Sequence, residues 1–260
     1  TSAPALAAIQ DGSLGNGELF MTVWDEVGQK SYTLDLNLKM NDFLSGIAVS
    51  GTSYSYAADA NMTSFLSGVS DVSSLKFAIG AMDNSGATGT DYYRYITTAT
   101  NIIPGNSTAN QVTNSNLKNL GASGDQFLGN TNGQIGSANS LIVTDPALIS
   151  YAGSAQWGNN WGNAANFIST GLIDNNSIVD SGDLGMYFLR QSSGTFPTRN
   201  NASIYEAISQ NGSQIFANLD MNGNLLVAAA VPEAETYAMM LAGLGLVGFM
   251  VRRRAASAVR

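Results

Sequence analysis

Two tryptophans at helical spacing are the side chains in this sequence best suited to holding a ligand. Trp157 and Trp161 lie four residues apart, and Asn159, Asn160 and Asn163 lie among and after them. Residues four apart share one face of a helix, so the two indoles would lie side by side. Flat rings stack on the C–H faces of sugars while amides match their hydroxyl groups, so the pattern indicates a possible glycan platform. The alternative is a core helix whose indoles face inward.

A second group of oxygen-bearing side chains follows within ten residues. Asp174, Asn176, Asp180 and Asp183 lie in a loop-like stretch that also contains Gly182. Calcium prefers such ligands on a flexible loop, although the spacing differs from that of an EF-hand. The group is a weak calcium candidate beside the simpler interpretation of a solvated turn. We expect no cofactor and no other metal.

The catalytic inventory is narrow because the chain has no histidine and no cysteine. Disulfides, thiol nucleophiles, zinc–thiolate sites and Ser–His or Cys–His pairs are therefore excluded. A carboxylate pair, a lysine base or oxygen-bound calcium would remain for an enzyme. No phosphate-binding glycine loop or zinc motif is present, and we expect a protein that is not an enzyme. A carboxylate-based glycosidase or lyase is the catalytic alternative.

Charge is sparse and acidic. Residues 1–230 carry seven Lys or Arg against 17 Asp or Glu, and charged residues make up 12% of the whole chain. Such a body gains nothing from a phosphate backbone, so nucleic acid is excluded as an expected partner. Many small polar side chains with little charge suit an extracellular surface that meets sugars or copies of itself.

The last thirty residues have a different organisation. Val231, Pro232 and Glu233 precede an uncharged apolar run, Tyr237 to Val251, and three arginines then follow at 252–254. Fifteen helical residues span roughly 22 Å, against a hydrocarbon core of about 30 Å, so the run would be a short anchor. The positive cluster would stay on the cytoplasmic side and leave the body outside. The alternative is an ordinary buried C-terminal helix.

This tail resembles the PEP-CTERM sorting signal of bacteria that make exopolysaccharide. The resemblance rests on Val231-Pro232-Glu233, the apolar run and Arg252, Arg253 and Arg254, although Ala234 stands where a second proline is usual. It implies a membrane-embedded exosortase as partner, cleavage near the Pro-Glu pair, and export of the body. The stretch from Gly15 to Phe20, with Asn41-Asp42-Phe43, is similar to the N-terminus of one set of proteobacterial PEP-CTERM proteins.

Three segments are expected. Residues 1–16 form a flexible N-terminus after a signal peptide, since Ala5-Leu6-Ala7 resembles a signal-peptidase site; a plain flexible end is equally open. Residues 17–230 form a β-rich extracellular body, and residues 231–260 form the sorting and anchor segment.

Alternating apolar residues predict the strands of the body. Hairpins are expected at 17–40, with one dry and one wet face on its second strand, at 74–98, and at 213–230 around Asn222-Gly223. Shorter strands are expected near Tyr54, at 141–143 and at 186–190, and 202–208 is expected to form a strand or a short helix. Helices are expected at 61–69, capped by Thr63 or Ser64, and within 106–129, with a loop at 129–139.

We therefore expect a mainly β fold, an antiparallel sandwich-like body with a helical insertion near residues 106–170 and a C-terminal hydrophobic helix. The expected function is that of a secreted, non-catalytic protein of an extracellular matrix, biofilm or floc, at the cell surface or beyond it. Its partners would be polysaccharide, matrix proteins or further copies of itself. A carbohydrate-binding module built on Trp157 and Trp161, or a self-assembling filament or sheet subunit, are the alternatives.

Overall fold

A computed structural model describes residues 8–85, 93–99, 114–153, 177–178, 184–191 and 204–229 of this 260-residue chain. They belong to a compact unit that ends at Ala229, and a second unit begins at Ala230. The elements are η1 (Gly12–Leu14), β1 (Glu18–Asp25), β2 (Lys30–Lys39), α1 (Met40–Ile47), β3 (Tyr54–Tyr56), α2 (Ala60–Ser67), η2 (Val72–Ser74), β4 (Lys76–Asp83), β5 (Arg94–Ala99), α3 (Asn114–Ile135), β6 (Ser140–Val143), β7 (Ser177–Ile178), β8 (Leu184–Arg190), β9 (Ile204–Ala207), β10 (Ser209–Gln210), β11 (Ser213–Leu219) and β12 (Leu225–Ala229).

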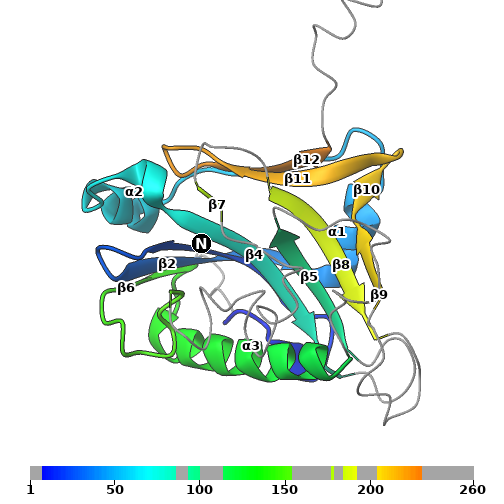
Figure 1. Ribbon diagram of the computed structural model, residues 1–260, viewed down its shortest axis with the longest axis horizontal. Coiled ribbons are helices and arrows are strands. Elements are labelled where there is room, and N and C mark those ends of the chain that lie inside the picture. The colour runs from blue at the N-terminus through cyan, green and yellow to red at the C-terminus, as the bar shows by residue number, and fades with distance from the viewer. Residues whose placement is uncertain are drawn as a thin grey trace, which may run out of the picture. The chain divides into compact units, whose positions relative to one another are not determined.

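The described strands form one antiparallel sheet in the order β3-β12-β11-β8-β5-β4-β1-β2-β6, with β7, β9 and β10 paired beside this path. The sheet curls, so that β11 and β12 lie at one end of it and β2 and β6 at the other (Figure 1). The prediction of a mainly β, antiparallel fold is confirmed. The sandwich arrangement is not confirmed, because these strands belong to a single curled sheet.

The three expected hairpins are present. β1 pairs with β2, β4 with β5, and β11 with β12, each antiparallel. The first two hairpins are joined through β1 and β4, which pair from Phe20↔Gly80 to Trp24↔Lys76. β1 and β4 therefore form the middle of the sheet, with a neighbouring strand on each side.

Both faces of β1 are buried. Leu19, Met21 and Val23 point into an inner core, the cluster on the concave face, which also receives Phe77 from β4. Phe20 and Trp24 point to the other face and join an outer core with Phe127 of α3. Successive side chains of a strand point to opposite faces, so alternate residues of β1 enter different cores. Bulky side chains on both faces of β1 are thus buried.

The polar face of β2 differs from its prediction. Thr33 and Asp35 were expected to face water with Asn37 and Lys39. Asn37 and Lys39 are exposed, but Thr33, Asp35 and the neighbouring Ser31 are at most 4% exposed. The segment after α3 covers them, since Ala152 N–H donates to Ser31 Oγ at 3.0 Å and Asp35 N–H to the carbonyl of Asn139 at 2.8 Å. Alternation alone shows which side chains share a face, but it does not show whether a later segment covers that face.

α3 covers the outer face of the sheet (Figure 1). Leu117, Leu120, Phe127 and Leu128 form its buried stripe. The helix runs to Ile135, so the expected loop at 129–139 is wrong for its first seven residues. A buried Thr and Ile at 131 and 135 continue the stripe, which outweighs the low helix propensity of the intervening glycines.

The close approach of α3 to the sheet requires a residue without a side chain at position 121. A Cβ on Gly121 would lie 2.3 Å from the hydroxyl oxygen of Tyr95 and 2.3 Å from Oδ1 of Asn84. The Tyr95 hydroxyl itself donates to Asn84 Oδ1 at 2.5 Å. The helix thus packs directly over a buried polar pair between β4 and β5.

Two short helices pack against the inner core. In α1, which the sequence analysis did not predict, Met40, Phe43 and Ile47 are buried at helical spacing. α2 is close to its predicted bounds, but its cap is wrong. Asp59 caps it, accepting a hydrogen bond from Met62 N–H at 2.7 Å, because a cap must precede the first helical residue.

α2 connects the two ends of the curled sheet. Asn61 donates to the backbone and hydroxyl oxygens of Ser140 in β6 at 3.2 and 2.9 Å. On its other side, Ala58 N–H donates to Asn224 beside β12, and Met62 lies against Gly223. α2 therefore lies beside β6 and near the β11–β12 turn, and contacts both ends of the sheet (Figure 1).

Two Asn-Gly pairs form different turns. The predicted pair, Asn222-Gly223, lies in a longer turn in which only Gly223 has positive φ, at 84°. Asn211 and Gly212 both have positive φ, 51° and 82°, and form the tight turn between β10 and β11. Asn211-Gly212, which was not predicted to form a hairpin turn, is therefore the pair that forms the tight two-residue turn.

These two glycines provide a test of how α2 is packed. Gly212 has nothing within 4 Å of a Cβ, whereas a Cβ on Gly223 would lie 2.3 Å from Cγ of the buried Met62. We expect Gly212→Ala to cost about 1 kcal/mol of stability through backbone strain. Gly223→Ala carries the same strain and also displaces Met62, so we expect a total loss of roughly 2–4 kcal/mol.

Urea unfolding of both variants measures the difference. Equal losses would show that the turn strain accounts for everything and that α2 does not hold this end of the sheet. In that case the contact of α2 with both ends of the sheet would not be a source of stability.

Candidate functional site at the N-terminal strap

Residues 8–17, here called the strap, are bound to α3. Ile9 N–H donates to Asn132 Oδ1 at 3.0 Å, and Asn132 Nδ2 donates back to the Ile9 carbonyl at 2.9 Å. Gly12 N–H donates to Asp125 Oδ1 at 3.1 Å, and the Ile9 side chain is 1% exposed. Residues 8–16 were expected to belong to a flexible N-terminus, but they are held in place here. Residues 1–7 lie outside the described part of the chain.

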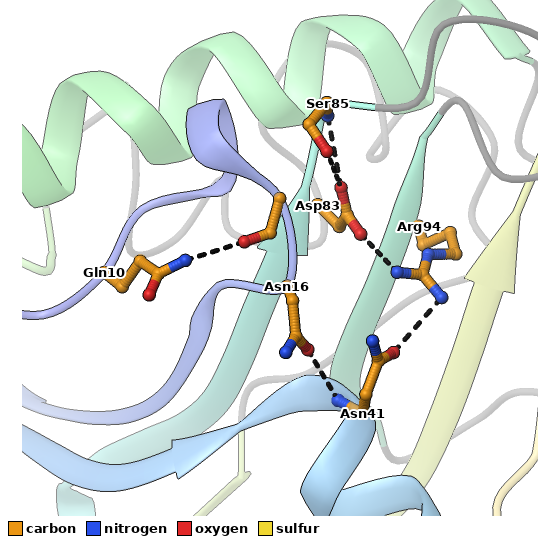
Figure 2. A network of polar contacts seen from close by, with 7 residues as sticks. Gln10, Asn16, Asn41, Asp83, Ser85 and Arg94 are labelled. Atoms are coloured by element: carbon orange, nitrogen blue, oxygen red, sulfur yellow. Dashed lines mark hydrogen bonds and ion pairs between the residues drawn. The ribbon is translucent and has the colours of Figure 1, made fainter.

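A polar junction holds the far end of the strap (Figure 2). Asn16 Oδ1 accepts from Asn41 N–H at 2.8 Å, and Asn41 Oδ1 accepts from Arg94 Nη1 at 3.2 Å. Arg94 also forms an ion pair with Asp83, whose Oδ1 accepts from the backbone and hydroxyl of Ser85. The junction fixes the strap to α1, β4 and β5 together.

The Asp83–Arg94 pair is electrostatically favourable. Burial by itself raises the pKa of Asp83, but the Arg94 guanidinium and the hydrogen bonds from Ser85 outweigh it and hold that pKa below its usual range. The carboxylate is thus ionised in the folded protein over the whole neutral range. Its role is to anchor the junction, since its oxygens are directed at Arg94 and Ser85.

A cavity of about 470 Å³ lies beside the strap. Its lining consists of four strap residues before the first turn of η1, one residue of that turn, and one cross-strand pair of the first hairpin: Ala8, Ile9, Gln10, Asp11, Leu14, Glu18 and Lys39. A volume of this size is within the range of small-ligand pockets, about 300–1,000 Å³. We call this space the strap cavity.

Three polar side chains of the strap cavity are each fixed through one atom. Glu18 Oε2 accepts from Gln10 N–H at 2.8 Å, and Gln10 Nε2 donates to the Gly15 carbonyl at 2.7 Å (Figure 2). Asp11 Oδ1 accepts from Ser13 N–H at 3.0 Å and caps η1. Glu18 Oε1, Gln10 Oε1 and Asp11 Oδ2 have no hydrogen-bond partner among the described residues.

Most of the other described carboxylates hold turns. Nine of the ten described aspartates accept a hydrogen bond from a backbone N–H: Asp11, Asp25, Asp35, Asp59, Asp71, Asp83, Asp125, Asp145 and Asp220. In seven of them the donor is two residues further along the chain, the geometry of an Asx turn. A carboxylate held in this way stabilises a loop, and it can bind a ligand only through its second oxygen.

The residues singled out from the sequence lie elsewhere. Trp157 and Trp161, the calcium candidates Asp174, Asn176, Asp180 and Asp183, and the tail residues Val231, Pro232, Glu233, Arg252, Arg253 and Arg254 are all outside the described residues. The glycan-platform and calcium interpretations therefore stay predictions. Within the described ranges, no three acidic side chains gather where they could hold a metal ion.

One protein-family model matches the C-terminal tail. Residues 230–254 match the family model of the PEP-CTERM protein-sorting motif. The tail is a PEP-CTERM sorting motif. The motif confirms the resemblance seen in Val231-Pro232-Glu233 and the arginine cluster, and it marks a secreted protein sorted through exosortase.

No curated protein and no solved structure matches the chain. Over the described ranges, no helix has both the length and the apolar character that crossing a bilayer requires. The run from Tyr237 to Val251 lies outside those ranges, so the membrane segment stays a prediction.

The strap cavity was missed because its residues are ordinary in sequence. Gln10 and Asp11 belong to a segment without periodicity, and Glu18 and Lys39 lie 21 positions apart. One usable signal was present. Asp11-Gly12-Ser13 has the Asx-turn composition, and Asp71-Val72-Ser73 repeats the same Asp-x-Ser spacing before η2.

Asp35 provides a test of electrostatics near the strap cavity. Burial raises the pKa of Asp35 to about 6 from 3.8; the Asn37 N–H opposes this shift and the Glu18 charge adds to it. Ionisation therefore destabilises the fold. The penalty is absent below about pH 3.8, grows as pH rises toward 6, and is complete above it.

We expect Asp35→Asn to stabilise the protein at pH 7.5 by up to about 3 kcal/mol, because two pKa units correspond to that energy. Its amide oxygen can still accept the hydrogen bond from Asn37. At pH 4 the gain should be nearly gone. Urea unfolding at the two pH values measures it.

Asp220→Asn is the control of opposite sign. Slight burial raises the pKa of Asp220, but hydrogen bonds from Asn224 and Asn222 outweigh it and lower the pKa. This variant should be less stable than the wild type at pH 7.5 and close to it at low pH. An Asp35→Asn protein that is no more stable at pH 7.5 than at pH 4, relative to wild type, would contradict the assignment.

Proposed function

We propose that this protein is a non-catalytic component of an extracellular matrix, biofilm or floc, delivered to the cell exterior through its C-terminal motif. Its partners are extracellular polysaccharide and other matrix proteins. The observation that carries the proposal is the PEP-CTERM motif at residues 230–254, directly after a folded β body. The expectation of a C-terminal hydrophobic anchor before processing is part of this proposal.

The chemistry of the body supports a structural role. Nine aspartates accept hydrogen bonds from backbone N–H groups, seven of them in Asx turns, and Glu26 and Glu206 pair with Lys76 and Arg190. A general acid–base pair needs carboxyl groups directed at a substrate rather than at their own backbone. The acidic side chains of the described body are thus used mainly for fold stability.

Self-association through sheet edges receives less support than polysaccharide binding. The strands at the two ends of the sheet path, β3 and β6, have three and four residues. α2 is bonded to β6 through Asn61, beside that edge. Short edges flanked by other elements are how proteins prevent edge-to-edge pairing.

Deletion of the motif tests delivery and role together. In the producing bacterium, a chain lacking residues 231–260 should fail to reach the matrix, while a chain lacking only residues 255–260 should sort normally, because the motif ends at 254. Immunodetection in the cell, medium and polysaccharide fractions measures sorting. Mass spectrometry of the protein recovered from the medium then locates the cut.

The matrix role has its own readout. A strain without the protein should retain no more than about half of the wild-type polysaccharide at its surface. The chain lacking only residues 255–260 should restore that retention. Unchanged matrix in the null strain would contradict the proposal. Release of reducing ends from the purified polysaccharide by the secreted protein would replace it with a catalytic function.

A further inference from the structure

We propose that the strap cavity binds a neutral or amino sugar unit of a saccharide chain. The inference rests on the proposed matrix function and gives its polysaccharide partner a place on the body. The cavity's volume of about 470 Å³ accommodates one or two sugar rings, and its lining mixes apolar and polar side chains. Small-ligand sites typically have this composition, with a few polar groups that fix the orientation.

The polar groups are preorganised acceptors. Glu18 Oε2, Asp11 Oδ1 and Gln10 Nε2 are engaged with the strap backbone at 2.8, 3.0 and 2.7 Å. The remaining oxygen of each side chain, Glu18 Oε1, Asp11 Oδ2 and Gln10 Oε1, has no hydrogen-bond partner among the described residues. A ligand that donates hydrogen bonds therefore meets acceptors whose rotamers are already fixed, which lowers the entropic cost of binding.

One apolar side chain of the cavity lining, Leu14, is exposed before binding. The Leu14 side chain is 83% exposed, the highest value among the exposed large hydrophobic residues of the described chain. It lines the strap cavity together with Ala8 and Ile9. The C–H face of a sugar ring would cover Leu14 while its hydroxyl groups reach the acceptors, which is the amphipathic match that a saccharide offers.

Charge decides which saccharide fits. Asp11 and Glu18 contribute two negative charges to the cavity and Lys39 contributes one positive charge. A uronate or sulfated sugar would bring its charge close to two carboxylates, which opposes binding. Hydroxyl groups, N-acetyl N–H groups and ammonium groups are donors and match the acceptors. A bare calcium ion fits less well, since it takes six to eight oxygen ligands and Lys39 shares the cavity.

Titration calorimetry of the full chain tests the inference with three probes: tetramers of glucose, N-acetylglucosamine and galacturonate. We expect at least one of the first two to bind with a Kd of about 1 mM or tighter, and galacturonate to bind at least about tenfold more weakly. Glu18→Gln and Asp11→Asn should each weaken binding about tenfold, because an acceptor oxygen becomes an amide donor while the oxygen that holds the strap is kept.

Asp71→Asn is the matched control. Asp71 caps η2 as Asp11 caps η1, with Oδ1 accepting from the backbone and hydroxyl of Ser73 at 3.0 and 2.6 Å. Asp71 does not line the strap cavity, so this variant should bind like the wild type. Leu14→Ala, at an exposed position, should weaken binding without lowering the urea midpoint.

Two results would overturn the inference: no binding of the glucose or N-acetylglucosamine tetramer up to 5 mM, or binding by Asp11→Asn and Glu18→Gln equal to that of Asp71→Asn. A preference for galacturonate would overturn the assigned sugar class. The proposed function is judged separately, by matrix retention in the deletion strains. Normal retention with unaltered binding by the cavity variants would remove the site and leave the matrix role standing.

Discussion

The burial of both faces of β1 and β4 is the constraint on which the rest of the body depends. A sheet with one buried face needs one covering layer, but here alternate residues of the same strands enter two cores. The concave side is filled by α1, α2 and the curl of the sheet itself, and the outer side needs α3. The long polar helix and the strap that it binds follow from this requirement, because Phe20 and Trp24 would otherwise face water.

The strap cavity follows from the same arrangement. α3 holds the strap through Asn132 and Asp125, and the polar junction at Asp83 and Arg94 holds its other end. The cavity lies against residues 8–11 and 14 of the strap and against the cross-strand pair Glu18 and Lys39. The acceptor side chains of the cavity are ordered because they also form hydrogen bonds within the strap. No further contacts are needed to fix their rotamers.

Much of the sheet could be predicted, because the hairpins β1–β2, β4–β5 and β11–β12 each have period-two alternation and a polar turn. The sequence could not show that the alternating face of β2 would be covered, since that depends on residues more than a hundred positions away. α1 was missed although Met40, Phe43 and Ile47 have helical spacing, because the preceding strand pattern runs into it without a break. α3 was placed but cut short, because its glycines at 129 and 133 are typical of loops.

Of the candidate sites, the sorting motif could be identified from the sequence and the strap cavity could not. The sorting motif is a contiguous signal whose residues, order and spacing act together, so it could be identified from sequence alone. The strap cavity is made of residues that are common in any loop and become a site only when the strap folds back over a hairpin. No local pattern contains that information, although the Asp-x-Ser turn at Asp11 indicates one of its fixed points.

The last strand of the folded body ends directly before the first residue of the sorting motif. β12 is held between β11 and β3, with Leu225 and Val227 buried, and it ends at Ala229. The matched motif begins at residue 230, where the second unit begins as well. Removal of the tail after that point leaves every strand of the sheet intact, whereas a cut two or three residues earlier would shorten a strand that pairs on both sides. Exosortase can therefore process the motif without removing a residue from any described strand.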